Sequence, residues 1–178
     1  METKENQGDI KAPSDEEIYE LAHRVVRRAT QAKLRIGTAE SCTGGLVAGA
    51  LTSVPGSSEA LVGGIVSYLA SIKHRLLNVE SSIIDDPALG VVSDACASEM
   101  AQGAALLLDC DIAVSVTGIA GPGGEEPGKP VGTVWFGIHG LAGTDTRLHL
   151  FTGDRRTVRR KAVVIALSLL EGALKSAQ

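Results

Sequence analysis

Cysteine is scarce in this sequence, and its few cysteines are far apart. They are Cys42, Cys96 and Cys110, and no two of them form a C-x-x-C pair. Such spacing does not indicate a disulfide framework or a zinc site, and it is typical of a protein from a reducing compartment. We therefore expect a cytoplasmic protein that has no metal site.

The sequence also lacks long apolar runs and a basic charge balance. No uninterrupted apolar stretch reaches the roughly 18 residues of a membrane-spanning helix, and the N-terminal stretch METKENQGDIKAPSDEE has no apolar signal core. The formal net charge is −4, whereas nucleic-acid-binding proteins are usually basic, and only DRRTVRRK (154–161) forms a basic cluster. Neither a membrane nor a nucleic acid is therefore expected as a partner.

Aromatic residues make up only 3% of the chain, whereas glycine occurs 21 times. The core must therefore be built from alanine, valine, leucine and isoleucine, and the placement of the glycines matters because glycine permits unusual backbone angles and close approach to a ligand. A length of 178 residues fits one domain with a proper core. We expect the polar residues 1–13 to be a disordered tail and residues 14–178 to form a single domain.

Strand and helix patterns alternate along the rest of the chain. Ser14 and Glu17 form an S-x-x-E capping box, which predicts the start of the first helix. Apolar periodicity and turn signals predict helices over 14–32, 43–54, 71–79, 93–108 and 154–176, and strands over 34–40, 61–69, 111–118, 133–140 and 146–153. This order predicts an α/β fold, a three-layer α/β/α sandwich with a mixed, mostly parallel sheet.

Four glycine-bearing corners lie at the ends of predicted strands: GTAESCTGG (37–45), SVTGIAGPGG (115–124), KPVGTVWFG (129–137) and FTGDRR (151–156). Ligands of open α/β sheets bind beyond the carboxyl ends of strands, and helix N-termini attract anions. A nucleotide-sized ligand with a phosphate fits this pattern, although the glycines of any single corner can simply permit a turn. The second corner opens a long loop, 119–132, and loops of that length are often functional.

The first corner offers two nucleophiles. Ser41 lies between a strand and a helix that starts with glycines, where the backbone N–H groups of Thr43 and Gly44 are candidates to hold an oxyanion. Cys42 is the rival, because a thiolate at a helix N-terminus is activated, although a small buried residue explains it too. Glu40 fits three roles, as a base, as a hydrogen-bond anchor or as a brace for the loop.

No histidine has a convincing catalytic context, so lysine is the remaining base. The four histidines lie in the first helix, beside a lysine or on strands: His23, His74, His139 and His149. Lys73 comes just after the predicted strand 61–69 and can lie over the same sheet edge as the first corner. It can act as a base near neutral pH only if burial or nearby cations lower its pKa, and a surface lysine is the alternative interpretation.

Five ordered motifs together resemble the CinA C-terminal-domain family. They are TAESCTGG (38–45), a tyrosine followed five residues later by a lysine, VSVTGIAGPGG (114–124), KPVGTVWFG (129–137) and FTGDRRTVRR (151–160). The resemblance covers residues 15–176, and the family's characterised activity is nicotinamide mononucleotide (NMN) deamidase. It implies a three-layer sandwich, hydrolysis without metal or other cofactor, a small nucleotide substrate and a homodimer or higher homo-oligomer. Full-length members carry a further N-terminal domain, and this sequence resembles the stand-alone form.

By position, the resemblance implies Ser41 as the nucleophile, Tyr68 as an assisting residue and Lys73 as the base. The substrate-binding positions that it implies are Glu40, Thr43, Gly44, Gly45, Thr117, Gly118, Arg155 and Arg159. The two arginines are the phosphate candidates, because a guanidinium fork suits phosphate geometry. Arg155 and Arg159 share one helix face, as do Arg156 and Arg160, so one of these pairs is expected to be only solvated.

One segment departs from the family pattern, because the usual Y-S-N-x-x-K is Y-L-A-S-I-K here. The tyrosine-to-lysine spacing is kept, while two polar side chains are absent. The catalytic trio survives, so the expected function is still hydrolysis of the NMN carboxamide. Two other functions remain open: a non-catalytic nucleotide-binding module, and an amidase that depends on Cys42 or acts on another small amide.

Overall fold

The structure, a computed structural model, describes residues 9–177. Its first helix, α1 (Asp15–Ala32), starts where the capping box predicts. The Ser14 hydroxyl accepts a hydrogen bond from the Glu17 N–H, and the Glu17 carboxylate accepts one from the Ser14 N–H. The helix ends at Lys33, which adopts the left-handed conformation common at helix C-termini.

Five strands form one mixed sheet in the order β2-β1-β3-β4-β5. They are β1 (Ile36–Glu40), β2 (Leu61–Val66), β3 (Ile112–Gly118), β4 (Thr133–Gly140) and β5 (Gly143–Leu150). β1 pairs in parallel with β2 and β3, while β4 runs antiparallel to β3 and β5. The mixed sheet expected from the sequence is therefore confirmed, and the carboxyl ends of β1, β2 and β3 meet at one edge.

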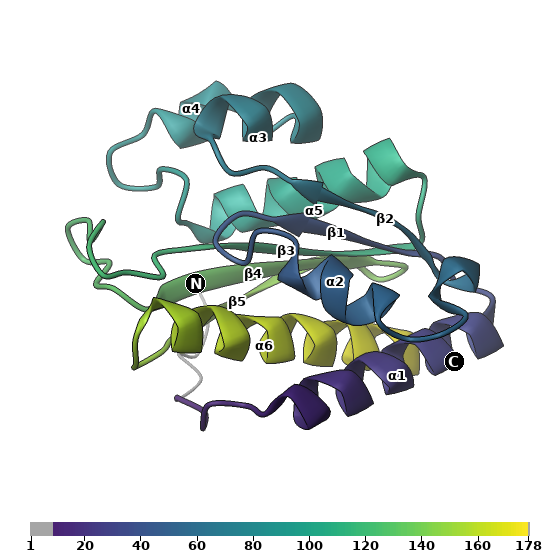
Figure 1. Cartoon of the computed structure of the whole chain (residues 1–178). Helices are drawn as coiled ribbons and strands as arrows, with labels where there is room; N and C mark the ends of the chain where they lie inside the picture. Colours follow the sequence, from purple (N-terminus) through teal and green to yellow (C-terminus); the bar gives the residue numbers. More distant parts are fainter. Residues whose placement is uncertain (1–8, 178) are drawn as a thin grey trace.

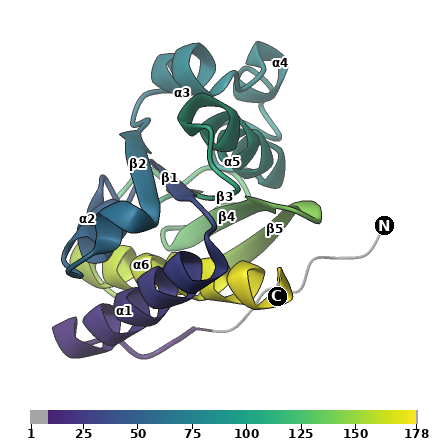
Figure 2. The same ribbon diagram turned by 90° about the vertical axis from the view of Figure 1, so that its right-hand side faces the viewer.

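Helices cover both faces of the sheet (Figures 1 and 2). On one face lie α2 (Leu46–Thr52) and α6 (Arg155–Ser176), with α1 packed against α6. On the other face lies α5 (Asp94–Leu108), with α3 (Ala70–Leu77) and α4 (Ser81–Ile84) outside it. This is the predicted three-layer α/β/α sandwich. Within residues 9–177, no helix is long and apolar enough to cross a membrane.

Small and aliphatic side chains fill both layers of the core, as the low aromatic content predicts. Val25, Leu51 and Leu167 are fully buried between the sheet and the α1, α2 and α6 layer. On the opposite face, α5 lies close to the sheet because Gly137 on β4 has no side chain. A Cβ at this position would overlap the Ala97 carbonyl of α5.

Several element boundaries differ from the sequence-based expectation. The strand predicted over 61–69 already ends at Val66, so the tyrosine of the Y-L-A-S-I-K segment lies in a connection rather than in the sheet. The short helix α4 and a 3-10 turn at Ser57–Glu59 were not predicted. The hairpin turn is shorter than expected, because β5 begins at Gly143.

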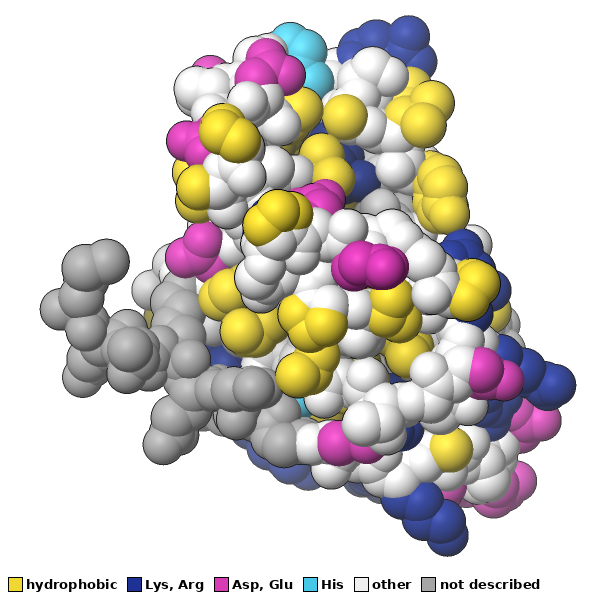
Figure 3. All heavy atoms as spheres, turned by 90° about the vertical axis from the view of Figure 1, so that its left-hand side faces the viewer, with side chains coloured by type: hydrophobic (Ala, Val, Ile, Leu, Met, Phe, Trp, Pro, Cys, Tyr) yellow, Lys and Arg dark blue, Asp and Glu magenta, His cyan; other side chains and the backbone are white. Residues whose placement is uncertain are grey.

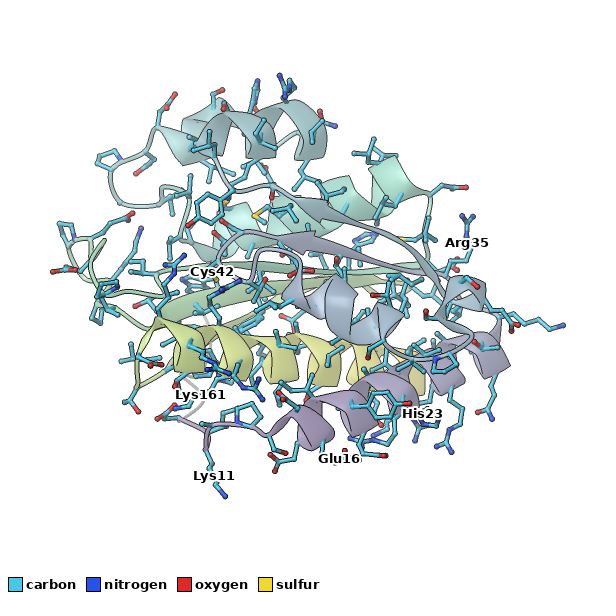
Figure 4. All side chains as sticks on the ribbon, viewed as in Figure 1. Lys11, Glu16, His23, Arg35, Cys42 and Lys161 are labelled. Atoms are coloured by element: carbon cyan, nitrogen blue, oxygen red, sulfur yellow. The ribbon has the colours of Figure 1, made fainter. Side chains whose placement is uncertain are left out.

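The polar segment that precedes α1 is held against α6. The buried Lys161 ammonium donates hydrogen bonds to the Asp9 carboxylate at 2.7 Å and to the Thr152 carbonyl at 2.9 Å. Figure 4 labels Lys161 on α6, beside the segment that carries Lys11. The hydrogen bond from Lys161, together with one from the Thr152 hydroxyl, lowers the pKa of Asp9 to about 2. Asp9 supplies the counter-charge that a buried ammonium needs. The expected disorder of the tail stays a prediction, and residues 1–8 lie outside the described part.

His149 on β5 leads to a prediction about stability at acidic pH. Its ring is buried, stacks on Phe151 at 5.3 Å between ring centroids and meets Phe136 edge-on. Burial lowers the pKa of His149 in the folded state, so the unfolded chain binds protons more readily below the ordinary value of 6.5. The free energy of unfolding should therefore fall as the pH drops through this range.

The variant His149→Leu should lose less stability over the same pH range than wild type. Urea unfolding at pH 7.5 and at pH 5 measures the difference, and the exposed His23→Leu is a matched control, because it removes an imidazole from the surface. An equal pH dependence in His149→Leu and wild type would contradict the prediction.

Candidate active site

A cleft of about 250 Å³ lies at the sheet edge where the parallel strands end. Its walls come from the chain after β1, the connection after β2, the ends of β3 and the loop that follows, and the first residue of α6. The lining residues with chemistry or a predicted role are Ser41, Cys42, Tyr68, Lys73, Thr117, Gly118, Glu126 and Arg155. Figure 3 looks onto this edge, where hydrophobic, acidic and basic side chains gather.

Ser41 and Lys73 contact each other directly at the base of this cleft. Ser41 follows β1 immediately, and its N–H donates to the Val116 carbonyl on β3 at 2.9 Å. The Lys73 ammonium on α3 donates hydrogen bonds to the Ser41 Oγ at 2.9 Å and to the Ser67 carbonyl at 2.6 Å. The two residues that the sequence reasoning paired therefore lie within hydrogen-bonding distance, which is the geometry of a nucleophile and its base.

The environment of Lys73 favours a neutral amine. Only 1% of the residue is exposed, and no described carboxylate forms an ion pair with it. Burial lowers the pKa of Lys73 below its ordinary value of 10.5, while the nearby thiols of Cys96 and Cys42 act in the opposite direction. A buried amine that loses its proton more readily can take the proton of the serine hydroxyl.

Cys42 lines the cleft but is a poor nucleophile. Figure 4 shows it at the sheet edge, on the chain that leaves β1. Burial raises the pKa of the Cys42 thiol to about 12, so it carries no thiolate at neutral pH. Between the two candidates of the first corner, the structure favours Ser41.

Tyr68 lies at the mouth of the cleft and does not bridge the serine and the lysine. Its residue is 57% exposed, and its hydroxyl accepts a hydrogen bond from the Arg155 guanidinium at 3.1 Å. Only its backbone carbonyl approaches the Lys73 ammonium, at 3.4 Å. Proton transfer from Ser41 to Lys73 needs no tyrosine relay in this arrangement, and a catalytic role for Tyr68 stays a prediction.

Glu40 braces the corner from behind. It is buried, and its carboxylate accepts hydrogen bonds from the N–H groups of Gly45, Val47 and Ala48 at the start of α2 and from the Thr38 hydroxyl. A carboxylate at this place satisfies free N–H groups and the helix dipole. Of the three roles left open by the sequence, the structure therefore assigns Glu40 that of a brace.

The other residues of the first corner also lie outside the cleft lining. Gly44 and Gly45 have φ angles of +62° and +94°, which glycine adopts without strain and which allow the tight turn into α2. The Gly44 N–H donates to the Ser41 carbonyl at 3.1 Å, so it is not free to hold an oxyanion as the sequence suggested. The Thr43 N–H donates to no described residue, but Thr43 lies outside the lining too, so its oxyanion role stays a prediction.

The two arginines predicted for the phosphate have different positions. Arg155 lines the cleft and also donates to the Gly121 carbonyl at 2.9 Å, so it joins the two sides of the mouth. Arg159 lies outside the lining and donates to the Cys42 and Thr43 carbonyls at 3.0 and 2.8 Å. We conclude that Arg155 is the better phosphate candidate and that Arg159 stabilises the loop that carries Ser41.

The two arginines on the other face of α6, Arg156 and Arg160, also differ in position. Arg160 donates to the Pro13 carbonyl and pairs with Asp15 at the start of α1, whereas Arg156 is exposed. This second pair is therefore not only solvated, because one of its members anchors the N-terminal segment.

The far wall of the cleft contains residues that the sequence reasoning did not single out. Thr117 and Gly118 lie in this wall as expected, and the Thr117 hydroxyl donates to the Val91 carbonyl at 2.6 Å. Val91, Val92, Ile119, Ala120 and Glu126 also line it. The length of loop 119–132 indicated function, but only the fold places Glu126, the one carboxylate among the described lining residues, in the same cleft as Ser41 and Lys73.

The Y-L-A-S-I-K departure has a structural consequence at the start of α3. Leu69 is the N-cap residue of this helix, is 63% exposed and makes no side-chain capping hydrogen bond. Its backbone already has the extended conformation that a capping serine adopts. Leu69→Ser should therefore stabilise the protein by about 1 kcal/mol.

Urea unfolding measures this gain, and Leu69→Ala is the matched control, since it removes the leucine without adding a cap. Equal stability of the serine and alanine variants would show that the cap is not formed.

Fold and site together define an α/β/α protein that carries a buried serine–lysine pair at the carboxyl edge of its sheet. The family model described as the CinA C-terminal domain matches residues 18–174. The chain therefore belongs to the CinA C-terminal domain family, as its motifs predicted.

Individual relatives agree with this assignment. A CinA-like protein of Leptospira borgpetersenii is 44% identical over 158 residues, which are 88% of this chain and 37% of that protein. Among solved structures, the competence damage-inducible protein A of Klebsiella pneumoniae has 38% identity and a TM-score of 0.85, covering 90% of this chain and 99% of its own. The competence/damage inducible protein CihA of Agrobacterium tumefaciens has 39% identity and a TM-score of 0.85, with 93% and 99% covered. The chain spans little more than a third of the length of the curated relatives it matches.

Proposed function

We propose that this protein is an NMN deamidase that hydrolyses the nicotinamide carboxamide to nicotinic acid mononucleotide and ammonia. The observation that carries the proposal is the 2.9 Å contact between Ser41 Oγ and the buried Lys73 amine. A serine needs a base to attack an amide carbon, and no described histidine lines this cleft. The family resemblance supplies the substrate.

In the proposed mechanism, Ser41 Oγ attacks the carboxamide carbon while neutral Lys73 takes the hydroxyl proton. The tetrahedral intermediate collapses, the carbon–nitrogen bond breaks, and Lys73 returns the proton to the leaving nitrogen, which departs as ammonia. Water then attacks the acyl-enzyme ester with Lys73 again as base, which releases the carboxylate and restores Ser41. The buried position of Lys73 serves both steps, because the amine must be neutral at their start.

The cleft supports a small substrate with an anionic group. Its volume of about 250 Å³ is slightly below the usual range for ligand sites, so a nicotinamide ring can fill it while a phosphate extends towards the mouth. Arg155 lies at this mouth with a planar fork that suits a phosphate. Phosphate recognition therefore needs Arg155 to exchange its contact with the exposed Tyr68 hydroxyl for one with the substrate.

Ammonia release from NMN by the purified protein, measured with chelator present, tests the proposal. Nicotinamide riboside is the matched control substrate, because it carries the same amide and ring but no phosphate. We expect turnover of NMN and a kcat/KM for the riboside that is lower by about tenfold or more, the loss expected when a charged hydrogen bond is removed. No ammonia from NMN, with the protein folded, would refute it.

Two alternatives remain as competing proposals. A non-catalytic nucleotide-binding module would bind NMN without turnover, and an amidase for another small amide would release ammonia from that amide only. The homodimer or higher homo-oligomer implied by the resemblance is likewise a proposal, which light scattering on the purified chain tests.

A further inference from the structure

Among the residues that the structure describes, Glu126 is the one carboxylate in the lining of the cleft, and the mechanism proposed above does not use it. It belongs to the loop between β3 and β4, where Glu126 and Lys129 exchange backbone hydrogen bonds at 3.1 and 2.8 Å. Lys129 also donates from its ammonium to the Leu89 carbonyl at 2.6 Å and to Glu126 Oε2 at 2.9 Å. These contacts fix the loop to the segment that contains Leu89 and hold the Glu126 carboxylate in place.

The arrangement of the two charges leaves the negative one facing the cleft. The Glu126 side chain is 40% exposed and lines the cleft, whereas the Lys129 side chain is 14% exposed and is not part of the lining. Lys129 contacts only Oε2, and Oε1 accepts no hydrogen bond from a described residue. One carboxylate oxygen is therefore available to a ligand.

The lining of the cleft contains charged side chains of both signs. Arg155 provides a cation at the mouth, Glu126 provides an anion in the loop wall, and Lys73 provides the buried amine. NMN carries both signs as well: its phosphate is negative, and its ring is positive because the ring nitrogen is alkylated by ribose. A ring whose carboxamide reaches Ser41 shares this cleft of about 250 Å³ with the Glu126 carboxylate, and unlike charges that share so small a space attract each other.

We propose that Glu126 is a specificity residue that selects substrates with a positively charged ring over neutral ones. This inference rests on the proposed function and adds to it the residue by which the cleft distinguishes a cationic ring from a neutral one. The ring keeps its charge while Ser41 attacks, so the carboxylate stabilises the bound substrate and the transition state equally. Its loss therefore raises KM and leaves kcat nearly unchanged.

The test compares NMN with its 1,4-dihydro form, which has the same phosphate and amide but a neutral ring. Binding of both to Ser41→Ala is measured by calorimetry at pH 8, and kcat and KM for NMN are measured in proteins with an intact Ser41. We expect Ser41→Ala to prefer NMN by about fivefold, the scale of a partly exposed charge pair. Adding Glu126→Gln should reduce this preference to about one and raise KM for NMN to a similar extent in the otherwise wild-type protein.

Glu125→Gln is the matched control, because it removes the same charge from the neighbouring position of the same loop, outside the cleft lining. It should keep both the preference and the KM of the parent. A preference unchanged by Glu126→Gln, or lost equally in Glu125→Gln, overturns the inference while NMN turnover by wild type still supports the proposed function. Absence of NMN turnover and binding overturns both.

Discussion

Ser41→Ala should lower the rate of ammonia release from NMN by about 10⁴-fold or more, the scale seen when a catalytic nucleophile is removed. The substitution removes the atom that would form the acyl-enzyme in the proposed mechanism, and among the described lining residues the buried, protonated Cys42 thiol does not replace it. Lys73 keeps its bond to the Ser67 carbonyl, so the cleft should retain its shape. Calorimetry should therefore show NMN affinity within a few-fold of wild type, while the coupled ammonia assay shows almost no turnover.

Cys42→Ala is the control for this experiment. The Cys42 thiol is buried, and a pKa of about 12 keeps it protonated, so its loss should leave turnover largely intact and at most reduce stability. The opposite pattern, with a rate close to wild type for Ser41→Ala and a large loss for Cys42→Ala, would falsify the serine assignment and favour a thiol-dependent amidase.

Lys73→Met should reduce kcat/KM by about 10²–10⁴-fold, the usual contribution of general acid–base catalysis. Methionine keeps an apolar stem of similar length but removes the amine that is proposed to take the Ser41 proton. In wild type, kcat/KM should rise with pH as the Lys73 ammonium deprotonates, with a midpoint below the ordinary lysine pKa of 10.5 because burial lowers it. The residual kcat/KM of Lys73→Met should not show this rise with pH.

The lowered pKa of Lys73 also makes the stability of the protein depend on pH. Because the folded state binds the Lys73 proton less tightly than the unfolded state does, wild type should gain free energy of unfolding as the pH rises towards 10.5. Lys73→Met removes this dependence and should be as stable as wild type or more stable at pH 7. A stability gain with a loss of activity is the signature of a group retained for chemistry.

Lys161→Met is the matched control, since it removes a second buried lysine, which lies on α6 but outside the cleft lining. It should lower the thermal midpoint, because Asp9 loses its partner, and leave the pH profile of kcat/KM unchanged. Two results would contradict the assignment of Lys73 as base. One is a wild-type kcat/KM that does not rise with pH, and the other is an equal loss of rate in Lys73→Met and Lys161→Met.

The amino-acid sequence by itself determined the local structure and the class of fold. The first helix starts at a capping box that needs only Ser14 and Glu17, and apolar runs such as Ile112–Gly118 predict buried strands without knowledge of their partners. Ser41 was also within reach of local reasoning, because a serine after a strand and before a glycine pair lies at the carboxyl edge of an α/β sheet.

Local patterns were less informative where the role of a residue depends on a distant partner. Arg155 and Arg159 are equivalent on a helix wheel, yet one lines the cleft and the other binds carbonyls of the chain after β1. The sequence left three roles open for Glu40. In the fold, its carboxylate accepts hydrogen bonds from the N–H groups at the start of α2, which makes it a brace.

Only the tertiary structure decided which residues meet in the cleft. Ser41 and Lys73 are 32 positions apart, and their 2.9 Å contact exists because β1 and β2 pair in parallel and end at the same edge. The pKa of Lys73 likewise depends on burial, which no local pattern reveals. The sequence determined which chemical groups each segment offers, because helix propensity and capping are local properties. Packing determined which of these groups act together, because desolvation and hydrogen bonding depend on what the fold brings within a few ångströms.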